Sequence, residues 1–206
     1  MDIEAAIRAH GSVAGACCWD LGAHFGIYTV GMALAVGPTG RVFAFEPDPV
    51  SFARCKRHIQ MNGLSWVRAF NAAASDAEGT AQLIVSNGLG DSTSHLKYEE
   101  ETLPIPGSTI TIALVSLDTL VDRKEVDPPN FIKVDVEGHA AKALAGARRS
   151  IQRMRPTLVI SFHSRSELDG SRLALEPLGY SAFESNGAEL TWADCLYRTA
   201  ILRCSS

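Results

Sequence analysis

The segment Ala16-Cys-Cys-Trp-Asp-Leu-Gly-Ala-His-Phe-Gly26, together with Arg41-Val-Phe-Ala-Phe-Glu46, decides the fold of this chain. The first segment predicts a buried strand at 16–20, a glycine turn and then a helix at about 25–36. The second segment predicts the next strand, and its last residue is an acid. Strand, glycine turn, helix, strand and terminal acid together form a βαβ unit of the kind that binds a nucleoside.

Apolar and amphipathic segments alternate along the rest of the chain, which favours an α/β fold built on a mostly parallel sheet. Asp48 and Pro49 predict the start of a helix, because Asp is a preferred N-cap residue and Pro fits the first helical position. The spacing of apolar residues predicts two further helices, at 144–154 and 167–178. The remaining strands are expected at about 66–72, 80–86, 108–115, 131–136, 157–163, 180–183 and 195–202.

Length and charge narrow the class of protein. With 206 residues, we expect a single domain over 1–206 that begins with a short helical segment at about 1–12. The chain carries 19 Lys and Arg residues against 23 Asp and Glu residues, a formal net charge of −4. This balance argues against a nucleic-acid partner, because proteins that bind phosphates concentrate cations.

Cysteine usage and the absence of targeting signals indicate the compartment. The five cysteines include no Cys-x-x-Cys pair, so neither a zinc ribbon nor a thioredoxin-like site is indicated. The N-terminus lacks the regions of a signal peptide, and the most apolar run, 30–36, is too short to span a membrane. We therefore expect a cytoplasmic protein without a membrane partner, whose thiols act as small buried hydrophobic groups. A homo-oligomer stays open.

The glycine turn and Glu46 indicate which nucleoside the unit binds. A carboxylate at Glu46 can accept both hydrogen bonds of a ribose diol. A dinucleotide site requires Gly-x-Gly-x-x-Gly so that pyrophosphate can approach the backbone, but His24 occupies the place of the second glycine. S-adenosylmethionine has no phosphate, and its cationic sulfonium suits Asp20. Three alternatives stay open: glycines that serve the turn alone, a nicotinamide-dependent oxidoreductase, and a binding module without catalytic activity.

Two acids and a histidine follow the strands predicted in the second half of the chain. Asp135 and Glu137 point to the same side of an extended backbone, and His163 ends the next strand. Because the carboxyl ends of parallel strands line the ligand crevice, we expect all three beside the nucleoside. His163 is the candidate base for deprotonating a hydroxyl, with Asp135 or Glu137 orienting it or holding the methionine ammonium group.

Two other interpretations of these residues stay open. Asp135, Glu137 and His163 have the donor atoms to ligate a divalent cation such as Mg²⁺ that binds the acceptor oxygen. Alternatively, His163 is a core histidine and the acids cap a helix that begins near His139. A similar choice applies to Asn71, which can reach an adenine edge or cap a loop.

The ordered motifs resemble the FkbM family of S-adenosylmethionine-dependent methyltransferases. The motifs that carry this resemblance are Asp20-Leu-Gly-Ala-His-Phe-Gly-Ile-Tyr28, Gly40-Arg-Val-Phe-Ala-Phe-Glu-Pro-Asp-Pro49, Asn62-Gly63, Asn71-Ala-Ala-Ala-Ser-Asp76, Phe131-Ile-Lys-Val-Asp-Val-Glu-Gly138 and Gly146-Ala147. The resemblance implies a Rossmann-like fold with a seven-stranded sheet, an antiparallel last strand and helices on both faces. It also implies O-methylation of a hydroxylated small molecule such as a polyketide or a sugar.

The resemblance further implies roles for individual residues. The methionine end of the cofactor would lie among the residues of the glycine turn, its ribose at the acid after the second strand, and its adenine beside the third strand. Asp135 would face the reaction centre. The family usually has Asn at the position of His24. The residues expected to bind the cofactor are Asp20, Gly22, Ala23, His24, Gly26, Glu46, Pro47, Asn71, Ala72 and Asp135. The loop over 86–107 is expected to shape the acceptor pocket.

Overall fold

A computed structural model describes residues 13–85, 95–96 and 108–204 of the chain. The helical segment expected at 1–12 and the loop expected at 86–94 lie outside the described residues. Of the segment 86–107, which was expected to shape the acceptor pocket, only residues 95 and 96 are described.

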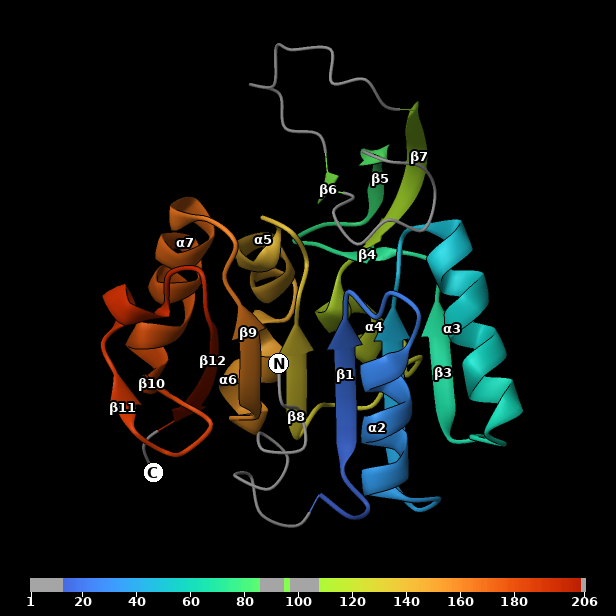
Figure 1. Ribbon diagram of the computed structural model, residues 1–206, viewed down its shortest axis with the longest axis horizontal. Helices are drawn as coiled ribbons and strands as arrows, with labels where there is room; N and C mark the ends of the chain where they lie inside the picture. The colour runs from blue at the N-terminus through green and yellow to red at the C-terminus, as the bar shows by residue number, and fades with distance from the viewer. Residues whose placement is uncertain (1–12, 86–94, 97–107, 205–206) are drawn as a thin grey trace.

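An eight-stranded sheet forms the centre of the molecule (Figure 1). Its strands in chain order are β1 (Cys17–Leu21), β2 (Arg41–Phe45), β3 (Val67–Phe70), β8 (Phe131–Val134), β9 (Thr157–Ser161), β10 (Tyr180–Phe183), β11 (Glu189–Leu190) and β12 (Thr199–Cys204). Their order across the sheet is β11-β10-β12-β9-β8-β1-β2-β3. The five strands from β9 to β3 pair in parallel, whereas β12 pairs antiparallel with both β9 and β10. The mostly parallel sheet and its antiparallel last strand are therefore confirmed.

The expected number of seven strands was too low by one. The additional strand is β11, which pairs antiparallel with β10 and extends the edge of the sheet. It forms because the chain turns back after β10, where the backbone amide of Glu184 donates to the carbonyl of Ala188 at 2.8 Å. Such a two-residue strand is too short to produce a recognisable alternation of apolar and polar residues.

Helices cover both faces of this sheet, as expected. They are α2 (Ile27–Val36), α3 (Pro49–Met61), α4 (Leu117–Asp122), α5 (Ala140–Ala145), α6 (Arg148–Met154) and α7 (Arg165–Leu175). Figure 1 shows α2 in front of the sheet and α4 and α6 behind it. The side chains of β1 alternate accordingly, since Cys18 packs into the core with α2 and α3, and Trp19 packs into the core with α4 to α7.

A second, four-stranded sheet lies beyond the carboxyl ends of the central strands (Figure 1). It consists of β4 (Ala73–Ala74), β5 (Gly79–Val85), β6 (His95–Leu96) and β7 (Ser108–Val115). β5 and β7 match the strands expected at 80–86 and 108–115, and they pair antiparallel with each other. β4 follows directly after β3, so the second sheet is attached beside the edge where the site is expected.

The helix expected over 144–154 is two helices, α5 and α6. They separate at Gly146, whose carbonyl accepts hydrogen bonds from Asp118 N at 2.8 Å and from Ser116 Oγ at 3.2 Å. The Asp118 carboxylate in turn accepts from the backbone amides of Arg149 and Ser150, which satisfies the first turn of α6. The break therefore arises from contacts with a distant segment that the local apolar spacing does not report.

The strand expected at 195–202 begins later than predicted. Residues Trp192–Cys195 form a 3₁₀ helix, η2, and β12 starts at Thr199. η2 begins in a capping box, because Thr191 N donates to Asp194 Oδ2 at 3.0 Å. The helix expected at 167–178 corresponds to α7 and a terminal 3₁₀ turn at Glu176–Leu178, closed by Gly179 in a left-handed conformation.

No helix within the described part of the chain is both long enough and apolar enough to cross a membrane. None of the five cysteines forms a disulfide; four are buried, and Cys204 is partly exposed. The buried thiols pack as small hydrophobic groups, as expected. Burial raises the pKa of Cys18 to about 12 and that of Cys55 to about 11, which keeps both thiols protonated.

Candidate active site

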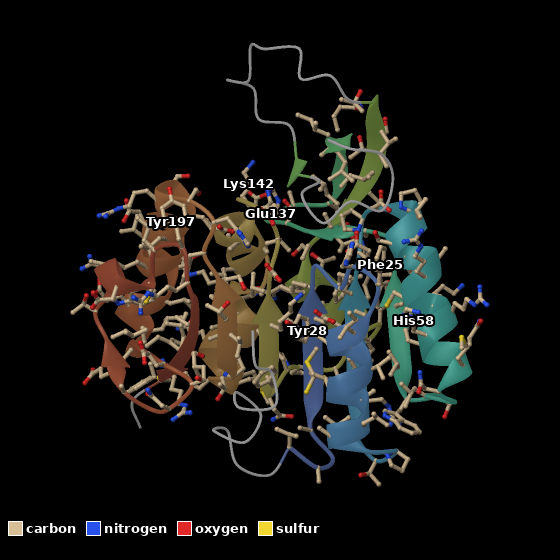
Figure 2. The ribbon with its side chains drawn as sticks, in the orientation of Figure 1. Phe25, Tyr28, His58, Glu137, Lys142 and Tyr197 are labelled. Carbon is tan, nitrogen blue, oxygen red and sulfur yellow. The ribbon has the colours of Figure 1, made fainter. Side chains whose placement is uncertain are left out.

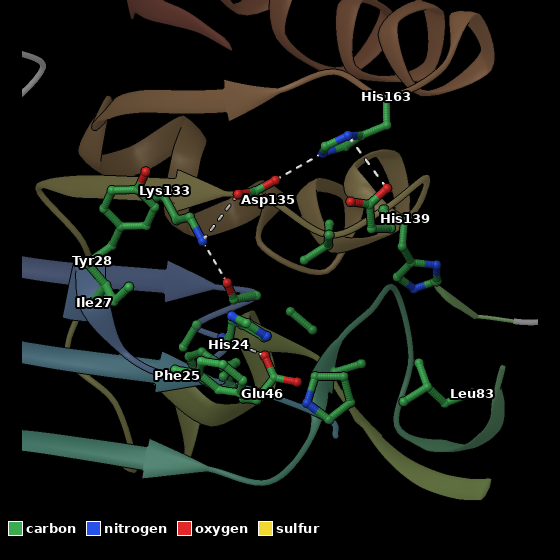
Figure 3. Close-up of a pocket in the computed structure, with 18 residues that line it drawn as sticks. His24, Phe25, Ile27, Tyr28, Glu46, Leu83, Lys133, Asp135, His139 and His163 are labelled. Atoms are coloured by element: carbon green, nitrogen blue, oxygen red, sulfur yellow. Dashed lines mark hydrogen bonds and ion pairs between the residues drawn. The ribbon is translucent and has the colours of Figure 1, made fainter. Parts of the chain in front are cut away.

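A cavity of about 300 Å³ lies at the carboxyl ends of β1, β2 and β8 (Figure 3). Its wall combines the glycine turn after β1, the acid after β2, and the polar residues that follow β8 and β9. Ala73, Ala74 and Leu83 of the second sheet complete it. The cavity is therefore at the place where a doubly wound sheet binds ligands.

Two glycines of the turn have no room for a side chain. Gly22 has a φ of 78°, and a Cβ there would lie 1.9 Å from the carbonyl oxygen of Asp135. Gly26 has a φ of 84°, and a Cβ there would lie 2.7 Å from Cys55 Sγ. Both glycines are thus required by packing and by backbone conformation. Gly22 and Ala23 also line the cavity, so the turn serves both the fold and the candidate site.

His24 adopts a left-handed backbone conformation, with a φ of 49°. Asn, Asp and His are the non-glycine residues that tolerate this region best. Because His and Asn both tolerate this conformation, His24 can occupy a position where the family usually has Asn. The imidazole stacks on Phe25 with ring centroids 3.7 Å apart, and both side chains lie on the cavity wall.

Glu46 is held by two backbone amides beside Pro47. His24 N donates to Oε2 at 2.7 Å, and Asp48 N donates to Oε1 at 2.9 Å. Burial raises the pKa of Glu46 to about 7, and the two amide hydrogen bonds oppose that rise. Each carboxylate oxygen has a second lone pair, so the group can also accept from two vicinal hydroxyls. This arrangement fits the ribose of a nucleoside.

Lys133 is a site residue that the sequence interpretation missed. Its Nζ donates to the carbonyl of Gly22 at 2.6 Å and lies 3.2 Å from Asp20 Oδ1. It also lies 3.8 Å from Asp135 Oδ2 and 5.4 Å from the ring centroid of Tyr28. A lysine within the apolar strand Phe131-Ile-Lys-Val was the signal available, because a buried lysine requires a partner.

Asp20 is placed differently from the position expected. It is 0% exposed and does not line the cavity; Thr29 Oγ1 donates to its Oδ2 at 2.6 Å, and Lys133 neutralises its charge. Its contacts hold α2 and Lys133 in place behind the glycine turn. Contact with a sulfonium would require displacing Lys133, so the geometry favours a supporting role.

Three further expected cofactor residues are also absent from the cavity wall. Gly26 lies behind it, against Cys55, and Ala72 is buried. Asn71 Nδ2 donates to the carbonyls of Glu46 at 2.8 Å and of Pro47 at 3.0 Å. The structure therefore supports the loop-capping interpretation of Asn71, which positions the backbone of Glu46.

Asp135, Glu137 and His163 converge, as predicted, and Figure 3 shows the Asp135 and His163 side chains pointing toward one another. His163 Nε2 lies 2.9 Å from Asp135 Oδ1, and Nδ1 lies 3.5 Å from Glu137 Oε2. The hydrogen bond with Asp135 raises the pKa of His163 above its usual 6.5, with burial opposing and the charge of Glu137 adding to the rise. Burial opposes the shift at Asp135, but His163 and Lys133 together lower its pKa.

The geometry separates the three interpretations of this cluster. Because Asp135 is an acceptor, the proton of a neutral His163 belongs on Nε2, and Nδ1 carries the lone pair. At the start of the following helix, α5, the Glu167 carboxylate accepts from Ala140 N at 3.2 Å. No group of three or more His, Cys, Asp or Glu side chains among the described residues is arranged to hold a metal ion. This tautomer of His163 leaves Nδ1 able to accept a proton, as the base interpretation requires.

His139 is a second histidine on the cavity wall, which the sequence interpretation noted only as a helix start. Its side chain is 6% exposed, and its Nε2 lies 3.1 Å from Ser75 Oγ. Ser75 donates its own proton to Asp76 Oδ1 at 3.0 Å, so Ser75 accepts from His139 Nε2–H. Burial and the charge of Lys142 lower the pKa of His139 to about 4, which keeps the ring neutral.

The cavity fits S-adenosylmethionine better than a dinucleotide. Among the described residues that line it, Lys133 is the only lysine or arginine, and Asp20 already pairs with it. A pyrophosphate would therefore find no free cation in this wall. Glu46 has the acceptors that a ribose diol requires, and apolar residues such as Phe25, Ile27 and Leu83 form much of the remaining wall.

Residues 20–190 match the model of the methyltransferase FkbM domain. The chain belongs to this family. The match spans the glycine turn, Glu46 and the residues after β8 and β9, so it covers the whole candidate site. Membership favours a methyltransferase over a nicotinamide-dependent oxidoreductase.

Two curated relatives are similar over most of this chain. One is "Hexuronic acid methyltransferase AglP" of Haloferax volcanii, which is 30% identical over 141 residues, covering 65% of this chain and 51% of the relative. The other is "2-O-methyltransferase NoeI" of Sinorhizobium fredii, which is 27% identical over 157 residues, covering 70% of this chain and 62% of the relative. The matched part of the chain spans about half to three fifths of these relatives.

Solved structures support the fold. The crystal structure of methyltransferase FkbM from Methylobacillus flagellatus KT has a TM-score of 0.58 and 23% identity, covering 93% of this chain and 44% of that chain. Fibrillarin of Aeropyrum pernix, solved with natively bound S-adenosyl-L-methionine, has a TM-score of 0.52 and 13% identity. The match covers 97% of this chain and 73% of that chain. The fold is that of the Rossmann-like S-adenosylmethionine-dependent methyltransferases.

Proposed function

We propose that this protein is an S-adenosylmethionine-dependent O-methyltransferase that acts on a hydroxyl of a small molecule. One observation carries the proposal: a single cavity is lined both by Gly22 with Glu46 and by Asp135 with His163. The first pair suits an adenosine-bearing methyl donor. The second pair suits a hydroxyl that must lose a proton.

Different residues of the cavity bind different parts of the methyl donor. Glu46 accepts from the ribose hydroxyls, and the amides that hold Glu46 keep its oxygens aimed at them. The turn from Gly22 to His24 lies beside the methionine end, with Lys133 fixing the Gly22 carbonyl from behind. S-adenosylmethionine supplies a methyl group on a positively charged sulfur, so transfer to a hydroxyl leaves a neutral thioether and releases one proton.

His163 receives that proton in the proposed mechanism. Asp135 holds the Nε2 proton and thereby leaves the Nδ1 lone pair for the acceptor hydroxyl. The imidazolium that forms lies between Asp135 and Glu137, and both carboxylates stabilise its charge. A divalent cation is not required by this arrangement, and adding or chelating magnesium during the assay tests that point.

We propose a saccharide as the acceptor class. AglP is named for a hexuronic acid and NoeI for a 2-O position, and a hexuronic acid is a saccharide that carries several hydroxyls. We also propose that residues 1–206 form one domain in the cytoplasm. The absence of a disulfide among the five cysteines, all of which are described, supports that location, because disulfides predominate in oxidising compartments.

Two measurements test the proposed function. Calorimetry should show that the chain binds S-adenosylmethionine, and incubation with saccharide acceptors should release S-adenosylhomocysteine. Absence of binding at millimolar donor would overturn the proposal. Binding without turnover on any hydroxylated acceptor would instead indicate a module that has lost catalysis.

A further inference from the structure

A second cavity, of about 460 Å³, adjoins the first. Four residues line both cavities: Tyr28, Asp135, Glu137 and His163. The Asp135–His163 pair is thus a shared wall, with the ribose-binding acid on one side and the second cavity on the other. In the view of Figure 2, Glu137 lies between Phe25, which lines only the first cavity, and Tyr197, which lines only the second.

Tyr197 presents an aromatic side chain to the second cavity under backbone strain. It is 74% exposed, and its φ of 58° is left-handed, a strained conformation for a non-glycine residue. The neighbouring backbone holds it there, because Arg198 N donates to Cys195 O and Phe162 N donates to Arg198 O, both at 3.0 Å. Strained residues that persist beside a cavity commonly serve a ligand. An exposed tyrosine ring offers an apolar face for the C–H groups of a sugar and a hydroxyl for hydrogen bonding.

Arg198 supplies positive charge at the same end. One of its guanidinium nitrogens lies 3.3 Å from Glu184 Oε1, and the side chain is 59% exposed. A guanidinium has five N–H donors in a fork that matches a carboxylate, so this one contact leaves donors for a second anion. Ser161 and Thr199 add a pair of hydroxyls, 3.0 Å apart, to the cavity.

The charges of the second cavity orient an anionic ligand. Asp135 and Glu137 lie at the end shared with the first cavity and repel a carboxylate there, whereas Arg198, which contacts Glu184 through one nitrogen, keeps further N–H donors for one. A ligand that carries both a carboxylate and hydroxyls would therefore direct the carboxylate to Arg198 and a hydroxyl to His163. This is the orientation that methylation of the hydroxyl requires.

We propose that the second cavity is the acceptor site and that it binds an acidic saccharide, with the sugar ring on Tyr197 and the carboxylate on Arg198. This inference rests on the proposed function. Arg198 and Tyr197 are then the two residues that select the acceptor, and they take no part in binding the methyl donor. Arg198 sets the preference for an acidic sugar, and Tyr197 binds acidic and neutral sugars alike.

The test compares p-nitrophenyl β-D-glucuronide with p-nitrophenyl β-D-glucoside as acceptors for the full chain. Arg198→Gln should raise the KM for the glucuronide about tenfold or more, because it removes a charge-assisted hydrogen bond, and leave the KM for the glucoside unchanged. The KM of Arg198→Lys for the glucuronide should lie between the values of the unmodified chain and of Arg198→Gln, since lysine keeps the charge but lacks the forked donors of a guanidinium. Tyr197→Ala should raise the KM for both acceptors by a similar factor. None of these variants should change the affinity for S-adenosylmethionine.

Arg172→Gln is the matched control. Arg172 is an exposed arginine paired with Glu176 on α7, and it lines neither cavity. An equal loss for both sugars in Arg198→Gln, or no loss, would overturn the carboxylate assignment. A methyl ester product in place of a methyl ether would overturn it as well, because the carboxylate would then lie at the reaction centre. Unchanged KM values in Tyr197→Ala would overturn the placement of the sugar ring.

The outcomes also separate this inference from the proposed function. Turnover of other hydroxylated acceptors, with neither sugar bound, would overturn the saccharide site and leave the methyltransferase proposal standing. Failure of the unmodified chain to bind S-adenosylmethionine would overturn the proposed function and this inference together.

Discussion

Asp20 and Lys133 are register partners on the neighbouring parallel strands β1 and β8, and Lys133 Nζ lies 3.2 Å from Asp20 Oδ1. Neither side chain is more than 1% exposed. The lysine also donates to the carbonyl of Gly22, so the ion pair connects the core to the turn that lines the candidate site. A charge on either side chain is tolerated only while its partner is present.

Lys133→Met should reduce the free energy of unfolding by about 3–5 kcal/mol, because it leaves the Asp20 carboxylate buried without a counter-ion. Urea denaturation at pH 7 measures the loss. The double variant Asp20→Asn with Lys133→Met should recover part of it, since no buried charge then remains. Equal stability of the unmodified chain and the single variant would show that the ion pair is not a structural element.

Glu46→Gln should raise the dissociation constant for S-adenosylmethionine by about tenfold or more, from the roughly 1.5–3 kcal/mol that a hydrogen bond to a charged group contributes. Burial raises the pKa of Glu46 to about 7, and ribose hydroxyls bind the ionised form more strongly. The affinity of the unmodified chain should therefore increase as pH rises through 7. Calorimetry from pH 6 to pH 8 should find no such increase in the variant, and an identical pH dependence in both would refute the ribose assignment.

His163→Ala should retain cofactor binding but reduce kcat by about 10²–10⁴-fold, the usual contribution of a general base. In the unmodified chain kcat should rise with pH through a pKa above 6.5, because the hydrogen bond with Asp135 raises the pKa and only the neutral ring accepts a proton. Release of S-adenosylhomocysteine measured across pH 6 to 9 provides the profile. A variant with full activity, or an unmodified chain whose rate does not change across this range, would reject the base role.

His139 should make the fold less stable as pH falls from about 6.5 to about 4. Burial and the charge of Lys142 lower its pKa to about 4 in the folded chain, whereas an unfolded chain has a value of about 6.5. The unfolded state therefore binds more protons within this window, and at about 1.4 kcal/mol per pH unit the effect approaches about 3 kcal/mol.

His139→Gln provides the comparison for that prediction, because it can keep a donor for Ser75 while removing the titrating group. The stability advantage of the unmodified chain over this variant should shrink as pH falls through the window. Glu46 has the opposite effect on stability. Because its pKa is raised to about 7 in the folded chain, its contribution to the free energy of unfolding declines as pH rises from about 4.5 to 7. Parallel pH profiles of stability for the unmodified chain and His139→Gln would contradict the assignment.

Local patterns predicted the elements and residues that depend on nearby sequence. The Asp48 side chain accepts from Ser51 N at 2.7 Å at the start of α3, with Pro49 at the first helical position, as Asp48-Pro49 indicated. Glu46 was recognisable from its place in the βαβ unit. It ends the second predicted strand, after the glycine turn and the helix, where an acid is typical of a ribose-binding site. The convergence of Asp135 and His163 followed from their place after parallel strands.

Other site features could not be predicted, because they depend on contacts between distant segments. Asn71 and Asp20 had plausible ligand roles until their partners were placed, and those partners are the carbonyl of Glu46 and the amine of Lys133. Tyr197 carries no motif at all. Its importance follows from a left-handed backbone and from a cavity it shares with residues far from it in sequence.

The sequence by itself determined the βαβ unit, its glycine turn and its terminal acid, because backbone conformation and strand periodicity are set by neighbouring residues. Only the tertiary structure decided which of the acids and histidines face a cavity and which are paired in the core. Asp20 lies one residue before the end of β1 and Asp135 one residue after the end of β8, yet strand register places the first against Lys133 and the second beside His163. Register and the packing of helices on the sheet are cooperative properties of the whole chain, so no local pattern records them.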